Sequence, residues 1–297
     1  MENKDYNKLL FNKMHIYKNK YDIIPEKDSH LGISIDVRDL SFVSEEFLNE
    51  LLDSVVEWVY SQEKYKDLVE HIIGKGKNIS SANAEIIRKA KNKFRKNDDQ
   101  LLVQGQFGEL LLFHFIQRFF CAEPILRKMP ITTSNKHERF GADAIHYVEE
   151  NGKNIIILGE AKTYTSDYSF NTAFENSINS ILDTYNGLSN ELDLYVYEDF
   201  LSENMKKIVE SYLDNSLFNI ETHLVSVVIY NETKKIKYTS ENEIKNQINK
   251  IIENHYKNFD NSKIDIKKHT ILNRITYIIF PVWALDELAN KFQKRLN

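Results

Sequence analysis

Two stretches of strand-forming residues lie on either side of an Asn-Gly pair near the middle of the chain. They span residues 143–148 and 154–161, and Asn151-Gly152 between them is a strong signal for a short β-hairpin. If these two residues form the loop, Asp143 on the first strand faces Glu160 on the second, because paired positions move outward together. We therefore predict an antiparallel hairpin whose open end brings two carboxylates together.

Apolar residues recur with helical or strand spacing along most of the remaining chain. Alternation of Ile33, Ile35 and Val37 with polar residues predicts a half-exposed strand. Gly187 is expected to end a helix that begins near residue 168. Further helices are predicted at 44–59, 101–120, 203–213, 241–258 and from 284, and further strands at 125–132, 223–230 and 274–280.

Length and composition set limits on the domain organisation. With 297 residues, 42% of them hydrophobic, the chain can form one large domain or two modest ones. We place a boundary in the polar segment 96–99, so that residues 1–97 form an N-terminal extension for packing or partner docking and 98–297 form the core.

The single cysteine, Cys121, excludes an internal disulfide and fits a reducing compartment. The N-terminus lacks a secretory apolar run, and the apolar helix near 110 carries too many polar residues to cross a membrane. We therefore expect a cytoplasmic protein with no membrane partner.

The paired acids of the predicted hairpin need a physical explanation. Carboxylates directly opposite each other on neighbouring strands destabilise a sheet by roughly 0.2–1 kcal/mol, and a divalent cation removes that repulsion. Mg²⁺ commonly takes one or two carboxylates together with water and phosphate oxygens. Lys162 lies on the same strand face as Glu160, where it can hold an attacking water and offset charge on a phosphate.

Asp143, Glu160 and Lys162 therefore indicate metal-dependent phosphodiester chemistry. The alternative is a solvated hairpin end with incidental charges. The interpretation also depends on register, because a slip of one residue would place Asp143 on the face opposite Glu160.

A carboxylate also interrupts the strongly apolar helix predicted at 101–120. Glu109 lies there among leucine and phenylalanine residues, and burial would require that it be paired or bind a ligand. Gly105 and Gly108 beside it cost helix propensity, about 1 kcal/mol each, but would let a backbone or ligand approach closely. Glu109 is therefore a candidate for the same site, and a partly exposed helix acid is the alternative.

The net charge of the chain is −5. Non-specific affinity for DNA comes mainly from Lys and Arg that neutralise phosphates, so two local clusters of basic residues are the candidates for DNA contact. The first, between residues 75 and 96, includes Arg88 and Lys89. It indicates a phosphate-facing strip, a contact for an acidic partner, or a solvated helix face. The second precedes the hairpin, where substrate contact is favoured and a charged loop without such contact is the alternative. Its members include Lys136, His137 and Arg139.

In its succession of elements and in the residues of the hairpin, the sequence resembles the PD-(D/E)xK nuclease superfamily. Asp143 matches the first acid of the superfamily, Glu160 the second and Lys162 the lysine. Glu109 fits the acid that many members carry on the first core helix, while Ala142 stands where the superfamily usually has proline.

This resemblance implies a fold, a cofactor and a substrate. The fold would be α/β, with a restriction-endonuclease-like core of a mixed central sheet flanked by helices and an N-terminal α/β extension. The cofactor would be Mg²⁺, with Mn²⁺ as a substitute, and the substrate DNA. Asp143, Glu160 and the backbone carbonyl of Ala161 would hold the metal, with Glu109 as a further candidate ligand.

A closer resemblance is to the nuclease subunit of the Hachiman antiphage defence system. The residues that carry it are Gly141-Ala142-Asp143 and Gly159-Glu160-Ala161-Lys162, together with the spacing from Glu109 and the long N-terminal region. It implies an effector nuclease that works in complex with a superfamily 2 helicase. Two other functions stay open: a catalytically silent module that docks a helicase, and a stand-alone restriction or repair nuclease.

Overall fold

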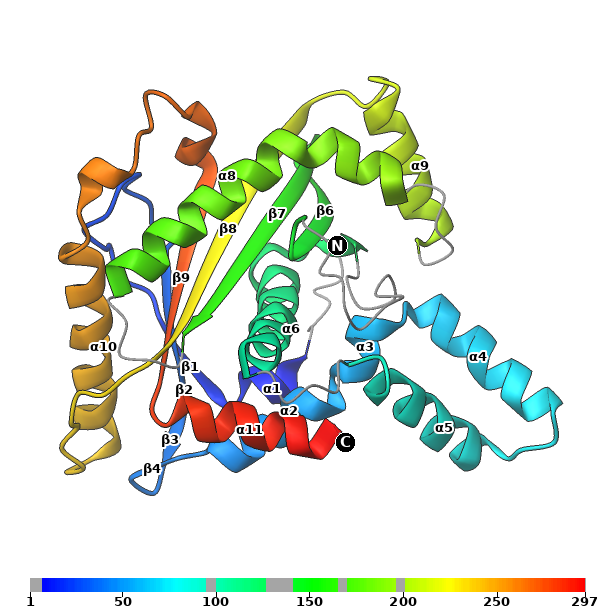
Figure 1. The fold of residues 1–297 in the computed structure, drawn as a ribbon, viewed down its shortest axis with the longest axis horizontal. Helices are drawn as coiled ribbons and strands as arrows, with labels where there is room; N and C mark the ends of the chain where they lie inside the picture. Colours follow the sequence, from blue (N-terminus) through cyan, green and yellow to red (C-terminus); the bar gives the residue numbers. More distant parts are fainter. Residues whose placement is uncertain (1–6, 95–99, 127–140, 165–169, 196–200, 297) are drawn as a thin grey trace.

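A computed structural model of the protein describes residues 7–94, 100–126, 141–164, 170–195 and 201–296 (Figure 1). Within these residues a mixed seven-stranded sheet forms the centre, in the order β1-β2-β9-β8-β7-β6-β5. Strands β2, β9, β8 and β7 are parallel, whereas β1, β6 and β5 are antiparallel to their neighbours. The strands are β1 (Met14–Tyr17), β2 (Leu31–Ile35), β5 (Glu123–Leu126), β6 (Ala144–Glu150), β7 (Lys153–Tyr164), β8 (Ile220–Asn231) and β9 (Ile275–Val282).

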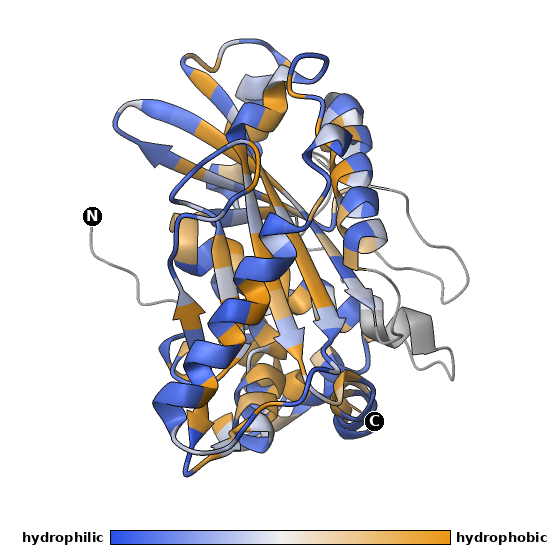
Figure 2. Cartoon of the chain, turned by 90° about the vertical axis from the view of Figure 1, so that its left-hand side faces the viewer, coloured by the Kyte–Doolittle hydropathy of each residue, from blue (hydrophilic) through white to orange (hydrophobic). Residues whose placement is uncertain are grey.

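Helices cover both faces of this sheet. On one face lie α2 (Ser44–Asp53), α6 (Gln100–Phe120) and α11 (Leu285–Leu296), and on the other lie α8 (Phe170–Tyr195) and α10 (Glu241–Lys257). Successive strand residues point to opposite faces of the sheet. Ile157 of β7 therefore packs in the core beneath α2, α6 and α11, and Leu158 packs in the core beneath α8 and α10. Figure 2 shows hydrophobic strands between helices whose outer sides are hydrophilic. The predicted α/β fold, a mixed central sheet flanked by helices, is confirmed.

The remaining elements surround this framework. They are α1 (Lys8–Phe11), α3 (Val55–Val59), α4 (Gln62–Gly74), α5 (Ile79–Lys91), α9 (Glu203–Leu213), the short strands β3 (Val37–Arg38) and β4 (Ser41–Phe42), and the 3₁₀ helices η1 (Asn261–Lys263) and η2 (Thr270–Arg274). No helix in the described part of the chain is long and apolar enough to span a membrane.

The hairpin β6–β7 has the predicted register. Glu150 pairs with Lys153 at the turn, and Ala144 pairs with Gly159 at the other end. Asn151 and Gly152 have φ angles of 52° and 74°, the left-handed values that a tight two-residue hairpin loop requires. The pairing therefore brings Asp143, which directly precedes β6, next to Glu160.

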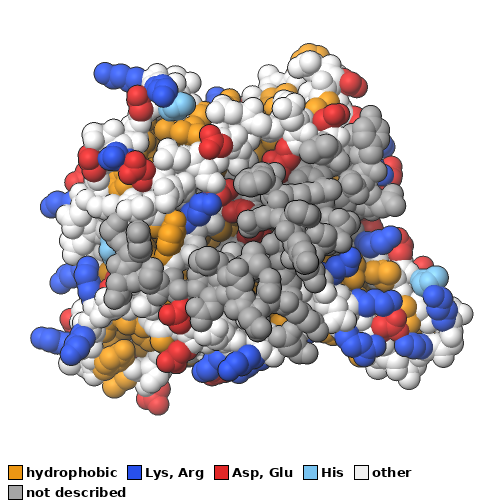
Figure 3. Space-filling model, viewed as in Figure 1, with side chains coloured by type: hydrophobic (Ala, Val, Ile, Leu, Met, Phe, Trp, Pro, Cys, Tyr) orange, Lys and Arg blue, Asp and Glu red, His pale blue; other side chains and the backbone are white. Residues whose placement is uncertain are grey.

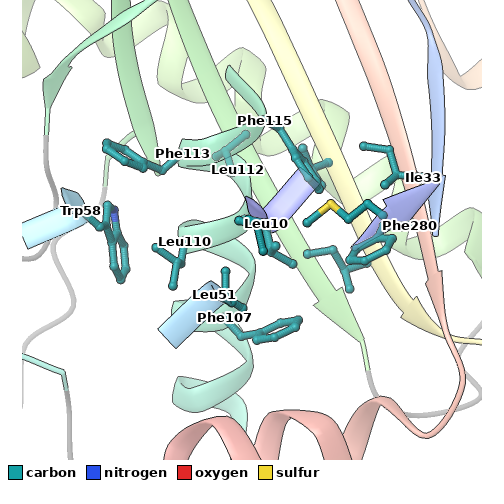
Figure 4. Close-up of a cluster of buried hydrophobic side chains, with 14 of the residues drawn as sticks. Leu10, Ile33, Leu51, Trp58, Phe107, Leu110, Leu112, Phe113, Phe115 and Phe280 are labelled. Atoms are coloured by element: carbon teal, nitrogen blue, oxygen red, sulfur yellow. The ribbon is translucent and has the colours of Figure 1, made fainter. Parts of the chain in front are cut away.

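Helix α6 fixes the hairpin from one side. Its apolar residues meet side chains from five other elements in the core drawn in Figure 4: Phe107, Leu110, Leu112, Phe113 and Phe115 lie with Leu10, Ile33, Leu51, Trp58 and Phe280. The helix approaches β7 closely because Gly159 has no side chain; a Cβ there would lie 2.7 Å from Ile116. Full burial of each large apolar side chain contributes roughly 1.5–3 kcal/mol, so this packing holds β7 firmly in place.

The N-terminal region contributes two strands to the same sheet. β2 is hydrogen-bonded to both β1 and β9, and all of its residues are buried. The expectation of a half-exposed strand at 33–37 was therefore wrong, because β2 is an interior strand covered on both faces. Ser34 is fully buried, with its hydroxyl 3.2 Å from that of Tyr17. The predicted domain boundary at residue 97 lies outside the described residues.

The prediction that Gly187 ends its helix was also wrong. α8 continues through Gly187 to Tyr195, and the residues beyond the glycine include the buried Leu188 and Leu192. A glycine inside a helix costs about 1 kcal/mol, which is less than the roughly 1.5–3 kcal/mol gained by burying each leucine. Tertiary packing thus extends the helix past its local stop signal.

Candidate active site

Asp143 is held against β7 by a backbone hydrogen bond. The side chain is 9% exposed, and its Oδ2 accepts the N–H of Ala161 at 3.0 Å. The N–H and C=O of one strand residue point toward the same neighbouring strand, so the carbonyl of Ala161 also faces the side on which Asp143 lies. The hydrogen-bonded pairing of β6 with β7 begins only at Ala144, opposite Gly159. The carbonyl of Ala161 lies beyond this pairing.

Glu160 is buried in the middle of β7, with only 3% of its surface exposed. Its Oε1 accepts hydrogen bonds from Lys162 Nζ at 2.8 Å and from Ser180 Oγ of α8 at 2.5 Å. Its Oε2 is buried and has no hydrogen-bond partner among the described residues. Burial, reinforced by the nearby charge of Asp143, raises the pKa of Glu160 to about 7.

Lys162 lies partly open to solvent, with 30% of its side chain exposed. Burial lowers the pKa of its ammonium, but attraction to Glu160 and Asp143 outweighs burial and leaves the pKa above its ordinary value. Lys162 is therefore a cation at neutral pH. The structure brings Asp143, Glu160 and Lys162 together, as the hairpin register predicted.

The donor set of this cluster fits a hard divalent cation. Two neighbouring carboxylates, one with a buried oxygen that lacks a partner, repel each other until positive charge is placed between them. The carbonyl of Ala161 adds a third oxygen on the same side. The described residues contain no group of three His, Cys, Asp or Glu side chains suited to a metal, and Mg²⁺ usually takes only one or two protein carboxylates.

Two residues of the site were missed by the sequence analysis, and both lie on α8. Glu191 is 8% exposed, and both of its carboxylate oxygens accept the N–H of Ala142 at 3.0 Å. Ser180 donates to Glu160, as described above. One signal pointed to the first contact: Gly141 precedes Ala142, and a Cβ at Gly141 would lie 2.3 Å from Glu191 Oε1. Glycine at this position leaves room for the Glu191 carboxylate.

The comparisons with known proteins identify the family of the chain. A profile of the HamA family matches residues 9–296. The chain belongs to the HamA family. HamA proteins are components of the Hachiman antiphage defence system, so this part of the predicted resemblance is confirmed. No curated protein matches the chain.

Glu109 of this HamA chain lies on α6, directly after a close contact with β7. A Cβ at Gly108 would lie 2.3 Å from Thr163 Oγ1, so the helix passes the strand at this point. Glu109 is partly exposed, and it does not form a three-acid group with Asp143 and Glu160. A direct role for Glu109 in metal binding stays a prediction.

The basic residues predicted to contact DNA fall in two places. Arg88 and Lys89 lie on α5, which forms with α4 a hairpin that projects from the body of the HamA fold (Figure 1). Lys89 pairs with Glu85 at 2.8 Å, and Arg88 is exposed; Figure 3 shows Lys and Arg gathered over this hairpin. Lys136, His137 and Arg139 lie outside the described residues. DNA contact by either cluster stays a prediction.

Proposed function

We propose that this HamA-family chain is a metal-dependent DNA endonuclease and the effector subunit of its Hachiman defence system. The observation that supports the proposal is the cluster of Asp143, Glu160 and Lys162 at the open end of one hairpin. Ionisation of these two neighbouring carboxylates costs stability, because Oε2 of Glu160 is buried without a partner among the described residues and the pKa of Glu160 is raised.

The residues divide the chemical work between them. Asp143, Glu160 and the carbonyl of Ala161 would hold Mg²⁺ or Mn²⁺, which supplies a Lewis acid that polarises phosphate oxygens and activates water. The N–H of Ala161 orients Asp143, and the hydroxyl of Ser180 orients Glu160. The ammonium of Lys162, held 2.8 Å from Glu160, offsets the negative charge that develops on the phosphate and orients the attacking water.

A helicase partner completes the proposal. The net charge of −5 gives the isolated chain weak non-specific affinity for DNA, since that affinity depends on Lys and Arg neutralising phosphates. A superfamily 2 helicase would deliver DNA and so restrict cleavage to the complex. Membership of the HamA family and the acidic balance of the chain are the grounds for this step.

Plasmid cleavage tests the proposal directly. Purified wild type is compared with Asp143→Asn and Lys162→Met, with Mg²⁺ or EDTA, and with or without the neighbouring helicase. We expect metal-dependent cleavage that each substitution reduces by about 100-fold or more, and a higher rate with the helicase. Glu149→Gln is the matched control, because Glu149 lies on the same hairpin but is exposed near its turn.

The outcomes separate the proposal from its alternatives. Full cleavage by Asp143→Asn and Lys162→Met would refute the assignment of the site. Absence of cleavage in every condition, with a stable complex between both variants and the helicase, would favour a docking module. Equal cleavage with and without the helicase would remove the partner from the proposal.

A further inference from the structure

A cavity of about 580 Å³ opens between the second half of α8 and the segment that leads into β9. Its size falls within the roughly 300–1,000 Å³ of small-molecule sites. The lining residues that matter to the argument are Tyr185, Asn186, Lys268, His269, Asn273 and Arg274. The first two lie on α8, the next two precede η2, and the last two lie within it.

The lining of this cavity is cationic. None of the described residues that line it is acidic, and the side chains of Lys268 and His269 have no hydrogen-bond or ion-pair partner within the described parts of the chain. Arg274 has a long ion pair of 3.8 Å with Glu221, which also pairs with Lys153. Figure 3 shows Lys or Arg and His side chains together at the upper left, over this end of the sheet.

A further lysine adds positive charge beside the cavity. Burial and the charge of Arg274 lower the pKa of Lys27, so the two cations lie close enough to repel each other. Like charges held together in this way favour the binding of an anion. Glu221 is shared between Lys153 and Arg274, so a single carboxylate serves two cations.

The other lining groups narrow the class of anion. Tyr185 offers a half-buried aromatic ring, on which a nucleobase can stack. The amides of Asn186 and Asn273 can donate to and accept from the edge of a base. We propose that this cavity is a binding site for a nucleoside phosphate, with Lys268 and Arg274 contacting the phosphate and Tyr185 the base.

The position of the cavity relates it to the candidate active site. Tyr185 follows Ser180 by five residues, or about 8 Å along α8 at 1.5 Å per residue, and Ser180 contacts Glu160. Joined to the proposed function, on which it then rests, the inference places in the cavity a nucleotide of the strand whose phosphodiester lies at the hairpin. A free nucleotide carries the same chemistry and is the other source of the ligand.

Binding measured by calorimetry in EDTA tests the inference without any cleavage. The probes are inorganic phosphate, deoxyadenosine monophosphate and an eight-nucleotide single strand. The variants are Lys268→Ala/Arg274→Gln and, separately, Tyr185→Leu, which keeps apolar volume but removes the ring. Lys250→Ala is the matched control, because Lys250 is an exposed lysine on α10 that does not line the cavity. Thermal unfolding verifies that each variant is folded.

We expect at least one of the two nucleotide probes to bind wild type. That probe should bind Lys250→Ala with the same affinity and Lys268→Ala/Arg274→Gln at least about tenfold more weakly. Tyr185→Leu should weaken both nucleotide probes and leave phosphate unchanged. Binding of the strand alone identifies a substrate subsite, and binding of the mononucleotide alone identifies a free ligand. Equal binding by wild type and the double variant, no binding of either nucleotide probe, or phosphate bound as tightly as nucleotide would overturn the inference. Cleavage by wild type is measured separately in the plasmid assay, so a failure of the nuclease proposal would appear there as absence of cleavage while nucleotide binding in EDTA persists.

Discussion

The backbone N–H of Ala142 donates to both carboxylate oxygens of Glu191, each at 3.0 Å, and so joins α8 to the segment that carries Asp143. A second contact from the same helix, the hydroxyl of Ser180 on Glu160, reaches the neighbouring strand. α8 therefore touches the segments that carry both carboxylates of the candidate site. We conclude that the distance between Asp143 and Glu160 is set by this helix as well as by the hairpin register.

Gly141→Ala should disturb this arrangement. The new Cβ would lie 2.3 Å from Glu191 Oε1, so the Glu191 carboxylate must shift and weaken its hydrogen bonds to Ala142, or the segment before β6 must move. We expect the free energy of unfolding to fall by about 1–3 kcal/mol, and cleavage to fall with it as Asp143 shifts. Urea unfolding and the plasmid assay measure the two effects; unchanged values in both would show that the contact with Glu191 is not needed.

Gly187→Ala should have the opposite effect on stability. Gly187 lies inside α8, and a Cβ there would meet nothing within 4 Å. Alanine should therefore raise the free energy of unfolding by about 0.5–1 kcal/mol, as expected for glycine replaced in a helix interior. Urea unfolding checks this result. A loss of stability would mean that α8 ends near Gly187, as the sequence pattern alone indicated.

The carboxylates and the lysine of the candidate site could be predicted because local rules fix their positions. The Asn-Gly turn sets the register, and alternation along β7 puts Lys162 on the face of Glu160. The contacts of Ser180 and Glu191 could not be predicted in the same way. They join residues 20 and 49 positions apart, and such pairings depend on how α8 packs across the sheet.

The errors in the fold have the same origin. A polar residue in an alternating strand indicates an exposed face, yet Ser34 is buried because helices cover both faces of β2, and its hydroxyl lies beside that of Tyr17. Gly187 is a local stop signal that the burial of Leu188 and Leu192 overrides. In both cases the decisive interactions are with residues distant in sequence, which periodicity does not record.

His30→Gln should reduce the acid sensitivity of the fold. Nδ1 of His30 accepts the N–H of Tyr277 at 3.1 Å, so the ring must be neutral, and burial lowers its pKa to about 4. Between pH 6.5 and about 4 the unfolded chain binds a proton at His30 that the folded chain does not, so stability falls with pH. This group contributes about 1.4 kcal/mol per pH unit in that window.

Urea unfolding of wild type and His30→Gln at pH 7.5, 6.5 and 5.5, conditions chosen to span the upper half of this window, measures the effect. Glutamine lowers stability at every pH, because it replaces a ring stacked on Tyr277. The difference between the two proteins should nevertheless narrow by about 1.4 kcal/mol for each unit below 6.5. A difference that is constant with pH would show that His30 titrates alike in the folded and unfolded chains.

Glu160→Gln should reveal the strain of the ionised site. The pKa of Glu160 is raised to about 7, chiefly by burial, whereas an unfolded glutamate titrates near 4.3. Above about pH 4.3, residue 160 loses its proton in the unfolded chain but keeps it in the folded chain. Wild type therefore loses stability as the pH rises toward 7. In EDTA, the free energy of unfolding of Glu160→Gln relative to wild type should therefore increase by about 1–3 kcal/mol between pH 4.5 and pH 8.

Mg²⁺ gives this prediction a second readout and a control. At pH 8 the ion should raise the unfolding temperature of wild type, because it offsets the repulsion between Asp143 and Glu160, and should have a much smaller effect on Glu160→Gln. Glu149→Gln, at an exposed position of the same hairpin, should follow wild type both in pH dependence and in its response to Mg²⁺. If Mg²⁺ stabilised Glu160→Gln as much as wild type, Glu160 would not be a metal ligand. A pH-independent difference between Glu160→Gln and wild type would instead show that Glu160 ionises in the folded protein as easily as in water.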